Sequence, residues 1–533
     1  MRAFTALYLG VATLVTAQDA IEPADFDVKA ALLRNGVDVS TIPALLGLVE
    51  SKSPAACSTA CSALKTIFGD AKVVTQNTPA YDAFTNSYWS VQQASVDPYC
   101  IFKSSTPLDV STVVLLARLT QCPFAVRSGG HAAFAGASNI QSGITISLQN
   151  LNEVVLSEDK SAAAIGPGNV WYDVYTKLEP KGLAVIGGRV AAIGVGGLTL
   201  GGGISFFSNI YGWACDNVLS YEVVTASGLI TTASPTTHSD LYWALRGGGP
   251  NFGIVTKFNL RTIQQGLMWG GGRLHLEPQF PAVIKAFYNL GRNAGEDTNA
   301  AQILSFAYAQ STKFASVDLQ YAKPVADAPI LAEYLAIPDN VTDTTRIRSL
   351  ADLTVQFNAS NPSGLRETYW AATFKLDQDF TSFIKDVFFE EIDGIVDAAA
   401  LVPAATLQVI TEPQLSHMSQ NGGNPLGLSV EDGPLILLNL NMMWSHIADD
   451  ERILLANSNI IKRTVAEAEA RGLANQYIYM NYASQFQDVI GSYGKGNEER
   501  LRRVAGKYDP TSVFQRLQPG YFGFGGAVDG GGV

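Results

Sequence analysis

Glycine is concentrated in three short segments of this 533-residue chain, which has 49 glycines in all. The densest segment is Gly194-Val195-Gly196-Gly197-Leu198-Thr199-Leu200-Gly201-Gly202-Gly203, with six glycines in ten residues. In a helix interior each glycine costs about 1 kcal/mol relative to alanine, so this composition argues against a helix core. Glycine instead lets a backbone turn tightly or come close to a flat or anionic ligand. The segment therefore predicts a ligand-binding turn.

The second segment is Arg127-Ser128-Gly129-Gly130-His131, which follows the β-like run Phe124-Ala125-Val126-Arg127. Two consecutive glycines after a strand allow backbone N–H groups to converge on an anion, and the serine hydroxyl adds a donor. This arrangement suits a pyrophosphate. The alternative is an ordinary turn beside an incidental histidine.

The third segment is Leu245-Arg246-Gly247-Gly248-Gly249-Pro250-Asn251-Phe252-Gly253. None of the three segments is followed by Gly-Lys-Ser/Thr, which argues against a P-loop. The Gly-x-Gly-x-x-Gly spacing of dinucleotide-binding turns also fails, because Thr199 stands three residues after Gly196. The spacing fails again in segment 166–171. NAD is therefore disfavoured as the cofactor.

The charge balance excludes one large class of partner. The chain has 36 basic and 48 acidic residues and a net charge of −12, so it has no surplus of Lys and Arg to neutralise nucleic-acid phosphates. Hydrophobic residues make up 47% of the chain, which is enough for large cores. After the N-terminus no segment reaches the ~18 uninterrupted apolar residues of a membrane span. We expect a monomer that acts on a small molecule, without nucleic-acid or membrane partners.

The N-terminus predicts the compartment. Arg2 precedes an apolar run from Ala3 to Val15, and Val15-Thr16-Ala17 offers small residues for cleavage. This pattern predicts a signal peptide over residues 1–17 and a secreted, extracellular protein, with an amphipathic first helix as the alternative. Two N-glycosylation sequons, which begin at Asn340 and Asn358, agree with export.

Five cysteines are present, and in an oxidising compartment four of them can pair. Cys57 and Cys61 are four residues apart in a helix-like stretch and therefore face one side. We expect them to pair with Cys100 and Cys122, in an order that the sequence leaves open. Cys215 is expected to be a buried thiol. A zinc site at Cys57 and Cys61 is the alternative, but no nearby histidine completes it.

The pattern of apolar residues indicates an α+β chain. Residues 26–95 have helical spacing, short β-like runs separated by glycine continue to about residue 262, and 263–480 mixes strands with helical stretches such as 448–469. That mixture is typical of a sheet with helices on one face. A charged helix is predicted over 498–507, and the C-terminal residues form a glycine-rich tail.

Together these motifs resemble the secreted FAD-linked oxidoreductases of the berberine-bridge-enzyme-like family, within the vanillyl-alcohol-oxidase superfamily. The resemblance is carried by Arg127 to His131, by Gly194 to Gly203 with 211–217, by 243–253, and by Asn481-Tyr482 and Tyr508-Asp509-Pro510 with Phe514 and Gln518. It implies a two-lobed fold: an FAD-binding domain over 25–262 with a PCMH-type core at about 94–265, and an α+β substrate domain with an antiparallel sheet over 263–484. A C-terminal segment, 485–522, completes the FAD domain, and 523–533 is the tail.

The resemblance also implies how FAD is held. His131 would bond covalently to the 8α-methyl group of the isoalloxazine, which a neutral imidazole can do as a nucleophile. Many family members add a second bond through a cysteine, but here Val190 stands at that position, so we expect attachment through His131 only. The cofactor-binding positions implied are Arg127, Ser128, Gly129, Gly130, His131, Ser138, Val190, Gly194, Gly196, Gly197, Gly202, Gly203, Ile254 and Asn481.

The catalytic residues are likewise expected by resemblance. Tyr482 is the candidate base, although Ser484 replaces the acidic partner that the family often has, so the phenol must be activated by another group. Asn439 and Asn441 lie on a strand that would face the flavin and are candidates to contact substrate. Ile193 corresponds to the family's oxygen-access position. No metal site is expected.

Three functions follow from this resemblance. The first is an oxidase that passes a hydride from an alcohol-bearing carbohydrate or aromatic compound to FAD and electrons to O₂, giving H₂O₂. The second is a dehydrogenase or oxidative cyclase of a secondary-metabolite pathway. The third is a flavin-carrying binding protein without activity.

Overall fold

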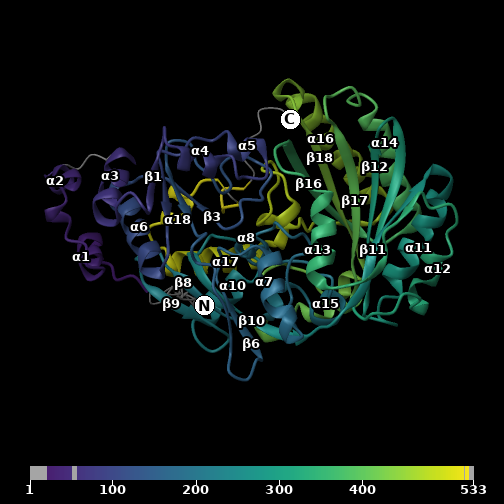
Figure 1. Cartoon of the computed structure of the whole chain (residues 1–533), viewed down its shortest axis with the longest axis horizontal. Helices are drawn as coiled ribbons and strands as arrows, with labels where there is room; N and C mark the ends of the chain where they lie inside the picture. The colour runs from purple at the N-terminus through teal and green to yellow at the C-terminus, as the bar shows by residue number, and fades with distance from the viewer. Residues whose placement is uncertain (1–20, 51–56, 521, 527–533) are drawn as a thin grey trace, which may run out of the picture.

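The computed structural model describes residues 21–50, 57–520 and 522–526. The signal peptide expected over 1–17 and the last residues of the expected tail lie outside these ranges. Figure 1 shows two lobes: the N-terminal part of the chain and the C-terminal helices form one, and the middle of the chain forms the other. Three sheets organise the molecule, two in the first lobe and one in the second.

The first sheet is small and mixed. Its strands, in the order β1 (Val73–Thr75), β2 (Cys100–Lys103), β4 (Ile144–Ser147) and β3 (Phe124–Arg127), pair antiparallel at β1–β2 and parallel elsewhere. Helix α6 (Pro107–Thr120) crosses from β2 to β3. It begins with Pro107 and a capping box between Thr106 and Asp109, which fixes its first turn.

The second sheet carries the core of the first lobe. It is antiparallel, in the order β5 (Val154–Leu156), β6 (Ala162–Ile165), β10 (Ile254–Gln264), β8 (Val218–Val224) and β9 (Ile230–Ala233), while β7 (Leu183–Val185) pairs with β10. Trp171 and Trp213 are fully buried in this core. The glycine-rich segments connect elements around it.

The third sheet fills the second lobe and is antiparallel throughout. Its order is β14 (Thr342–Asp343), β11 (Met268–Leu276), β13 (Thr312–Tyr321), β12 (Ala300–Ala309), β17 (Val402–Ile410), β18 (Leu435–Trp444), β16 (Arg366–Lys375) and β19 (Ala474–Asn475), with β15 (Arg346–Arg348) also on β11. The α+β class with an antiparallel sheet in the second lobe is therefore confirmed.

Helices cover one face of the third sheet. Helix α11 (Phe280–Arg292) places Phe280, Val283, Phe287 and Leu290 at helical spacing in the same core as the inward side of β12. The opposite face of the sheet faces the first lobe. The other helices are α1 (Val28–Arg34), α2 (Pro43–Glu50), α3 (Cys57–Phe68), α4 (Pro79–Thr85), α5 (Val91–Ala94), α7 (Trp171–Leu178), α8 (Val195–Leu200), α9 (Ser208–Tyr211), α10 (Ser239–Leu245), α12 (Ala332–Leu335), α13 (Leu350–Ala359), α14 (Gln378–Ile392), α15 (Glu412–His417), α16 (Asp450–Arg471), α17 (Lys495–Tyr508) and α18 (Val513–Leu517).

The C-terminal helices return to the first lobe. Helix α17 packs against α10, where Lys507 pairs with Asp240 at 2.7 Å, and α18 packs against α6. Phe514 makes an edge contact with Phe124 of β3. Phe524, which was expected to belong to the tail, packs on Phe252.

Two disulfides tie α3 to the first lobe. Cys57 pairs with Cys122 and Cys61 with Cys100, which resolves the connectivity that the sequence leaves open. The zinc alternative is excluded because both cysteines of α3 are oxidised. Cys215 is a buried free thiol, as expected.

The densest glycine segment differs in one respect from its prediction. Residues Val195–Leu200 form a single short helix, α8, so Gly196 and Gly197 are helical after all. The helix ends as the glycines resume, and Gly202 and Gly203 take φ values of +115° and +88° that side chains disfavour. The backbone therefore turns sharply only at the second half of the segment.

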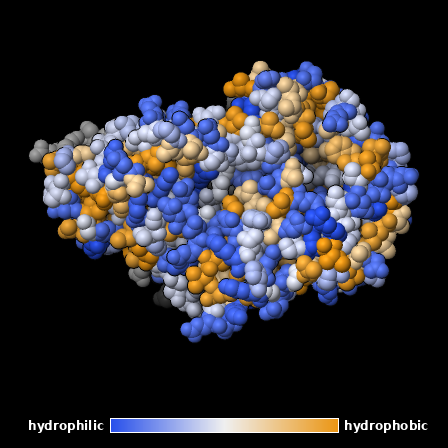
Figure 2. All heavy atoms as spheres, viewed as in Figure 1, coloured by the Kyte–Doolittle hydropathy of each residue, from blue (hydrophilic) through white to orange (hydrophobic). Residues whose placement is uncertain are grey.

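Within the described ranges no helix is both long and apolar enough to span a membrane. Figure 2 shows hydrophilic and hydrophobic residues interspersed on one face, with a hollow where the two lobes meet.

Candidate functional site

A cavity of about 620 Å³ lies between the lobes. One wall is formed by the glycine segments of the first lobe, and the other by the open face of the third sheet. Of the positions expected from the sequence, the cavity is lined by Ser128, Gly129, Gly130, His131, Ser138, Val190, Gly194, Gly196, Gly197, Ile254, Asn439, Asn441, Asn481 and Tyr482. Ile193 lines it as well.

The first two glycine segments touch each other at the cavity wall. A Cβ atom on Gly129 would lie 2.5 Å from the backbone nitrogen of Gly194, so both positions need glycine. Ser128 Oγ accepts a hydrogen bond from the Gly196 N–H at 3.0 Å and donates to the Pro167 carbonyl. A Cβ on Gly197 would meet nothing within 4 Å, and this residue lines the cavity. The pair of segments forms an open backbone cradle.

His131 is held by a stacked indole ring. The rings of Trp89 and His131 are 4.2 Å apart and 13° from parallel. Burial lowers the pKa of His131 to about 4, so the imidazole is neutral at pH 7. Its Nε2 atom is buried and has no hydrogen-bond partner among the described residues. A neutral, oriented imidazole with a free nitrogen has the properties of a nucleophile.

Three expected cofactor positions lie outside the cavity lining. The guanidinium of Arg127 donates to the carbonyl oxygens of Phe84 and Ser87 and lies over the Tyr88 ring, 3.9 Å from its centroid. Because Arg127 is the last residue of β3, these contacts hold the end of the strand that leads into Gly129 and Gly130. Gly202 and Gly203 turn the chain beneath the cavity, where the Gly203 N–H donates to Tyr479 Oη. Tyr479 itself lines the cavity.

The sheet face of the cavity carries a polar row across several strands. Cross-strand pairs place Ser316 beside Ser305, Ser305 beside Thr406, and Thr406 beside Asn439. The hydroxyls of Ser305 and Thr406 are 2.9 Å apart, and Thr406 donates to Asn441 Oδ1 at 3.0 Å. Asn439 Oδ1 is buried and has no partner in the part of the chain described. This row can therefore accept and donate hydrogen bonds to a polar ligand.

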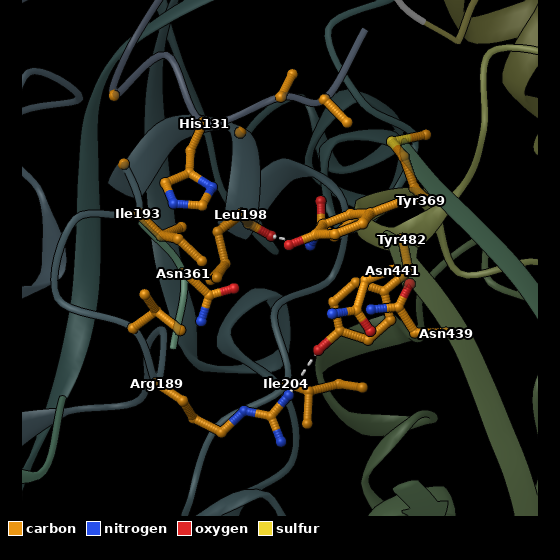
Figure 3. Close-up of a pocket in the computed structure, with 18 of the residues that line it drawn as sticks. His131, Arg189, Ile193, Leu198, Ile204, Asn361, Tyr369, Asn439, Asn441 and Tyr482 are labelled. Carbon is orange, nitrogen blue, oxygen red and sulfur yellow. Dashed lines mark hydrogen bonds between the residues drawn. The ribbon is translucent and has the colours of Figure 1, made fainter. Parts of the chain in front are cut away.

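Tyr482 lies where the two walls meet, in a short 3₁₀ turn at Met480–Tyr482. Its hydroxyl oxygen accepts hydrogen bonds from Arg189 Nη2 at 2.8 Å and Gln408 Nε2 at 3.0 Å, and Figure 3 shows the bond to Arg189. A cationic donor and an amide donor therefore converge on one phenol oxygen. The sequence analysis named neither of these two partners of Tyr482.

Ser484 forms no hydrogen bond with Tyr482 among the described residues. Its Oγ accepts from the Phe486 N–H, and its own N–H donates to Gln487 Oε1. These contacts form the turn that follows Tyr482. Asn481 faces the other way, where its amide donates to the Leu198 carbonyl and to Tyr479 Oη, each at 3.0 Å. A Cβ on Gly201 would lie 2.2 Å from Asn481 Oδ1, which explains that glycine.

A second cavity of about 220 Å³ lies behind Tyr369, which lines both cavities. Glu367 of β16 borders it, and its Oε1 atom is buried without a hydrogen-bond partner among the described residues. Burial raises the pKa of Glu367 to about 9, so the carboxyl is neutral at pH 7.

Several residues of the site were not predicted from the sequence. Trp89, Arg189, Tyr369 and Gln408 all depend on contacts between distant segments, such as the 293 residues that separate Arg189 from Tyr482. Arg189 directly precedes Val190, which was one of the expected cofactor-binding positions. The sequence therefore pointed to this segment but not to the arginine side chain. Trp89, Tyr369 and Gln408 lie in no recognisable motif, and no sequence signal marks them.

The residues present fit a flavin. The free Nε2 of His131, the open cradle at Gly197 and the polar sheet face surround one continuous cavity, as a flat cofactor with a phosphate-bearing chain requires. His131 would hold the ring, and the backbone of the glycine segments would hold the phosphates.

Comparison with known families agrees with this fit. The family described as FAD binding domain matches residues 98–234, and the family described as Berberine and berberine like matches residues 478–519. The first match contains His131 and the densest glycine segment, and the second contains Tyr482.

Relatives and solved structures extend the match over most of the chain. It is 39% identical over 447 residues to the FAD-dependent monooxygenase tpcD of Cochliobolus heterostrophus, covering 81% of this chain and 86% of the relative. The fold is similar to 6-hydroxy-D-nicotine oxidase of Arthrobacter nicotinovorans (TM-score 0.69, 20% identity, 85% of this chain and 97% of the other). It is also similar to xylooligosaccharide oxidase of Myceliophthora thermophila C1 (TM-score 0.69, 21% identity, 84% and 97%). The chain therefore belongs to the berberine-bridge-enzyme-like family of FAD-dependent oxidoreductases.

Proposed function

We propose that this protein oxidises an alcohol-bearing small molecule, a carbohydrate or an aromatic or secondary-metabolite alcohol, with FAD attached covalently through His131 and O₂ as the acceptor. The observation that carries the proposal is the Tyr482 oxygen, which lines the same cavity as His131 and receives two hydrogen bonds from Arg189 and Gln408. A base beside a hydride acceptor is the arrangement that alcohol oxidation needs.

In the proposed reaction Tyr482 takes the hydroxyl proton of the substrate while the C–H hydrogen leaves with its electron pair, so that a C–OH carbon becomes a carbonyl. Bound FAD would supply the two-electron acceptance, with H₂O₂ as the product of O₂. Arg189 and Gln408 stabilise the negative charge of the Tyr482 oxygen before the transfer. Asn439 and Asn441, on the neighbouring strand, line the same cavity and would orient the substrate.

Attachment at a single residue is supported by what surrounds the cavity. His131 has a free, buried Nε2. Val190 lines the cavity at the position where the family resemblance implies a second link, and a valine side chain cannot form a thioether. Cys215 is fully buried in the core of the first lobe and is not among the lining residues.

The covalent link is tested by denaturing the yellow protein in trichloroacetic acid and measuring flavin in the pellet. His131→Ala should leave the pellet colourless, whereas the exposed His446→Ala should not change it. Flavin released quantitatively from the wild-type protein would contradict the assignment of His131.

A second function is favoured by the names of the relatives, since tpcD is called a monooxygenase. A monooxygenase would insert one oxygen atom of O₂ into the substrate, whereas the proposed oxidase would place both in H₂O₂. A substrate screen of sugars and aromatic alcohols under ¹⁸O₂ separates the two. Peroxide with unlabelled product supports the oxidase, and product heavier by one ¹⁸O atom supports the monooxygenase. Reduction of the flavin without reoxidation in air would instead indicate a pathway dehydrogenase.

We also propose that the protein is secreted. The support is the predicted signal peptide together with two disulfides that an oxidising compartment would maintain. Expression with residues 1–17 fused to a reporter, followed by measurement of the reporter in the medium, tests this proposal.

A further inference from the structure

Asp318 is a charged side chain on the sheet face of the cavity that the proposed mechanism does not use. It lies on β13, paired across the sheet with Gly272 of β11 and Ile303 of β12. It lines the cavity, and none of the described residues forms a hydrogen bond or an ion pair with its carboxylate. Asp318 is partly buried, and burying a carboxylate costs free energy unless a ligand donates hydrogen bonds to it.

The sheet makes room for this carboxylate. A Cβ atom on Gly272 would lie 2.9 Å from Asp318 Oδ1, so the missing side chain on β11 is what lets the carboxylate lie against its neighbour strand. Ile303 lies directly across from Asp318 on β12, and Leu274 and Phe314 lie further along the same wall, with Ser316 between Asp318 and Phe314 on β13. Burial among these groups raises the pKa of Asp318 to about 6, which still leaves it ionised at neutral pH.

The position of Asp318 relative to Tyr482, the proposed base, indicates how long a bound molecule must be to contact both regions of the cavity. Tyr482 is hydrogen-bonded to Gln408 of β17, and β17 is separated from β13 by one strand, β12. Two strand spacings are roughly 10 Å. A molecule that lies along this sheet face from Gln408, the partner of Tyr482, to Asp318 is therefore about the length of two or three fused rings.

We propose that Asp318 binds a hydroxyl group at the end of the substrate opposite to the group that reacts near Tyr482. The substrate would then be a largely apolar aromatic compound that carries this second hydroxyl, rather than an alcohol with no other polar group. This inference rests on the proposed function, because it assumes that Tyr482 marks the reacting end. The apolar side chains of Leu274, Ile303 and Phe314 can contact rings, and the carboxylate of Asp318 selects for a hydrogen-bond donor. A hydroxyl is favoured over an ammonium group because the Arg189 guanidinium, which acts electrostatically on Asp318, repels a second cation.

The test measures binding and needs no turnover. Holoprotein is titrated by isothermal calorimetry at pH 7.5 with 2-naphthol and with 2-methoxynaphthalene, which differ by one donor. A hydrogen bond to an ionised group predicts that 2-naphthol binds at least about tenfold more tightly. Asp318→Asn should reduce this preference to less than about threefold and leave 2-methoxynaphthalene binding unchanged. Asp379→Asn, an exposed aspartate of α14, is the matched control and should keep the preference.

A second variant perturbs the carboxylate without replacing it. In Gly272→Ala the new methyl group should displace Asp318 Oδ1, so the preference for 2-naphthol should fall while 2-methoxynaphthalene binds as before. Equal binding of the two probes to the wild-type protein, or a preference that survives in Asp318→Asn, would overturn the proposal. Tighter binding of 2-naphthylmethylamine than of 2-naphthol, lost in Asp318→Asn, would overturn the hydroxyl assignment. If the preference holds while the substrate screen yields no oxidation, the proposed function fails and the binding site stands.

Discussion

Replacing Glu367 by glutamine should stabilise the protein, and increasingly so as the pH rises. Glu367 is 3% exposed, Oε1 has no partner among the described residues, and burial alone raises its pKa to about 9. Glutamine has nearly the same shape and cannot ionise. The exchange therefore removes the proton-dependent part of the stability and leaves the packing of β16 in place.

The size of the effect follows from linkage. In the unfolded chain the carboxyl titrates near 4.5, whereas the folded protein keeps its proton up to about pH 9. The folded-state pKa is raised, so the unfolded state binds fewer protons between these values and the free energy of unfolding falls as pH rises from 4.5 to 9. pH 7 is about 2.5 units above the pKa of the carboxyl in the unfolded chain. At about 1.4 kcal/mol per unit, the free energy of unfolding is therefore lower by about 3 kcal/mol at pH 7. At pH 5 the loss is less than about 1 kcal/mol.

The assay is urea unfolding of the wild-type and Glu367→Gln holoproteins at pH 5, 6, 7 and 8, followed by fluorescence. The difference in the free energy of unfolding should grow by roughly 1.4 kcal/mol per pH unit above pH 5. Glu499→Gln, on the exposed side of α17, should show no such slope. A difference that does not change with pH would refute the reasoning, because it would mean that Glu367 is ionised in the folded protein.

Further predictions concern the base, the flavin link and the disulfides. Tyr482→Phe should slow flavin reduction by substrate about 10²–10⁴-fold in anaerobic stopped-flow measurements while reoxidation by O₂ stays within twofold; an unchanged reductive rate would eliminate the base assignment. Arg189→Met should slow flavin reduction about 10–100-fold, and Arg189→Lys should slow it much less. In the double variant, Arg189→Met should slow the reaction of Tyr482→Phe only slightly further. Fully additive effects would show that the two side chains act separately. Peptide mapping should find flavin only on the peptide that contains His131, and a flavin-bearing Cys215 peptide would contradict single attachment. Cys122→Ser should lower the free energy of unfolding by about 2–5 kcal/mol under non-reducing conditions, and dithiothreitol, which reduces both disulfides, should lower it at least as much in the wild type.

The sequence predicted those parts of the molecule that depend on local pattern. Helix α3 with its two cysteines, helix α16 and helix α17 were all visible as apolar or charged patterns over ten or more residues. The glycine segments were recognisable because few other residues fit where backbones touch, as at Gly129 and Gly194. The cofactor side of the cavity could therefore be found without a structure.

The remaining parts depend on contacts between distant residues. The pairing of Cys57 with Cys122 needs the spatial order of α3 and α6, which no spacing encodes. The Arg189–Tyr482 hydrogen bond joins the two walls of the cavity, and Asp318 reaches the cavity only through the register of β13 with β11. The helix over Val195–Leu200 was missed because propensity weighs each glycine alone, whereas packing of the two glycine segments holds this one turn in place.

The return of the chain to the first lobe has a consequence for biosynthesis. His131, Asn481, Gln518 and Phe522 line one cavity, so residues synthesised long after His131 complete a wall that the first part of the chain begins. The cavity is complete only after Phe522 has been synthesised. A chain cut short before α17 has the histidine but lacks the C-terminal residues of this wall.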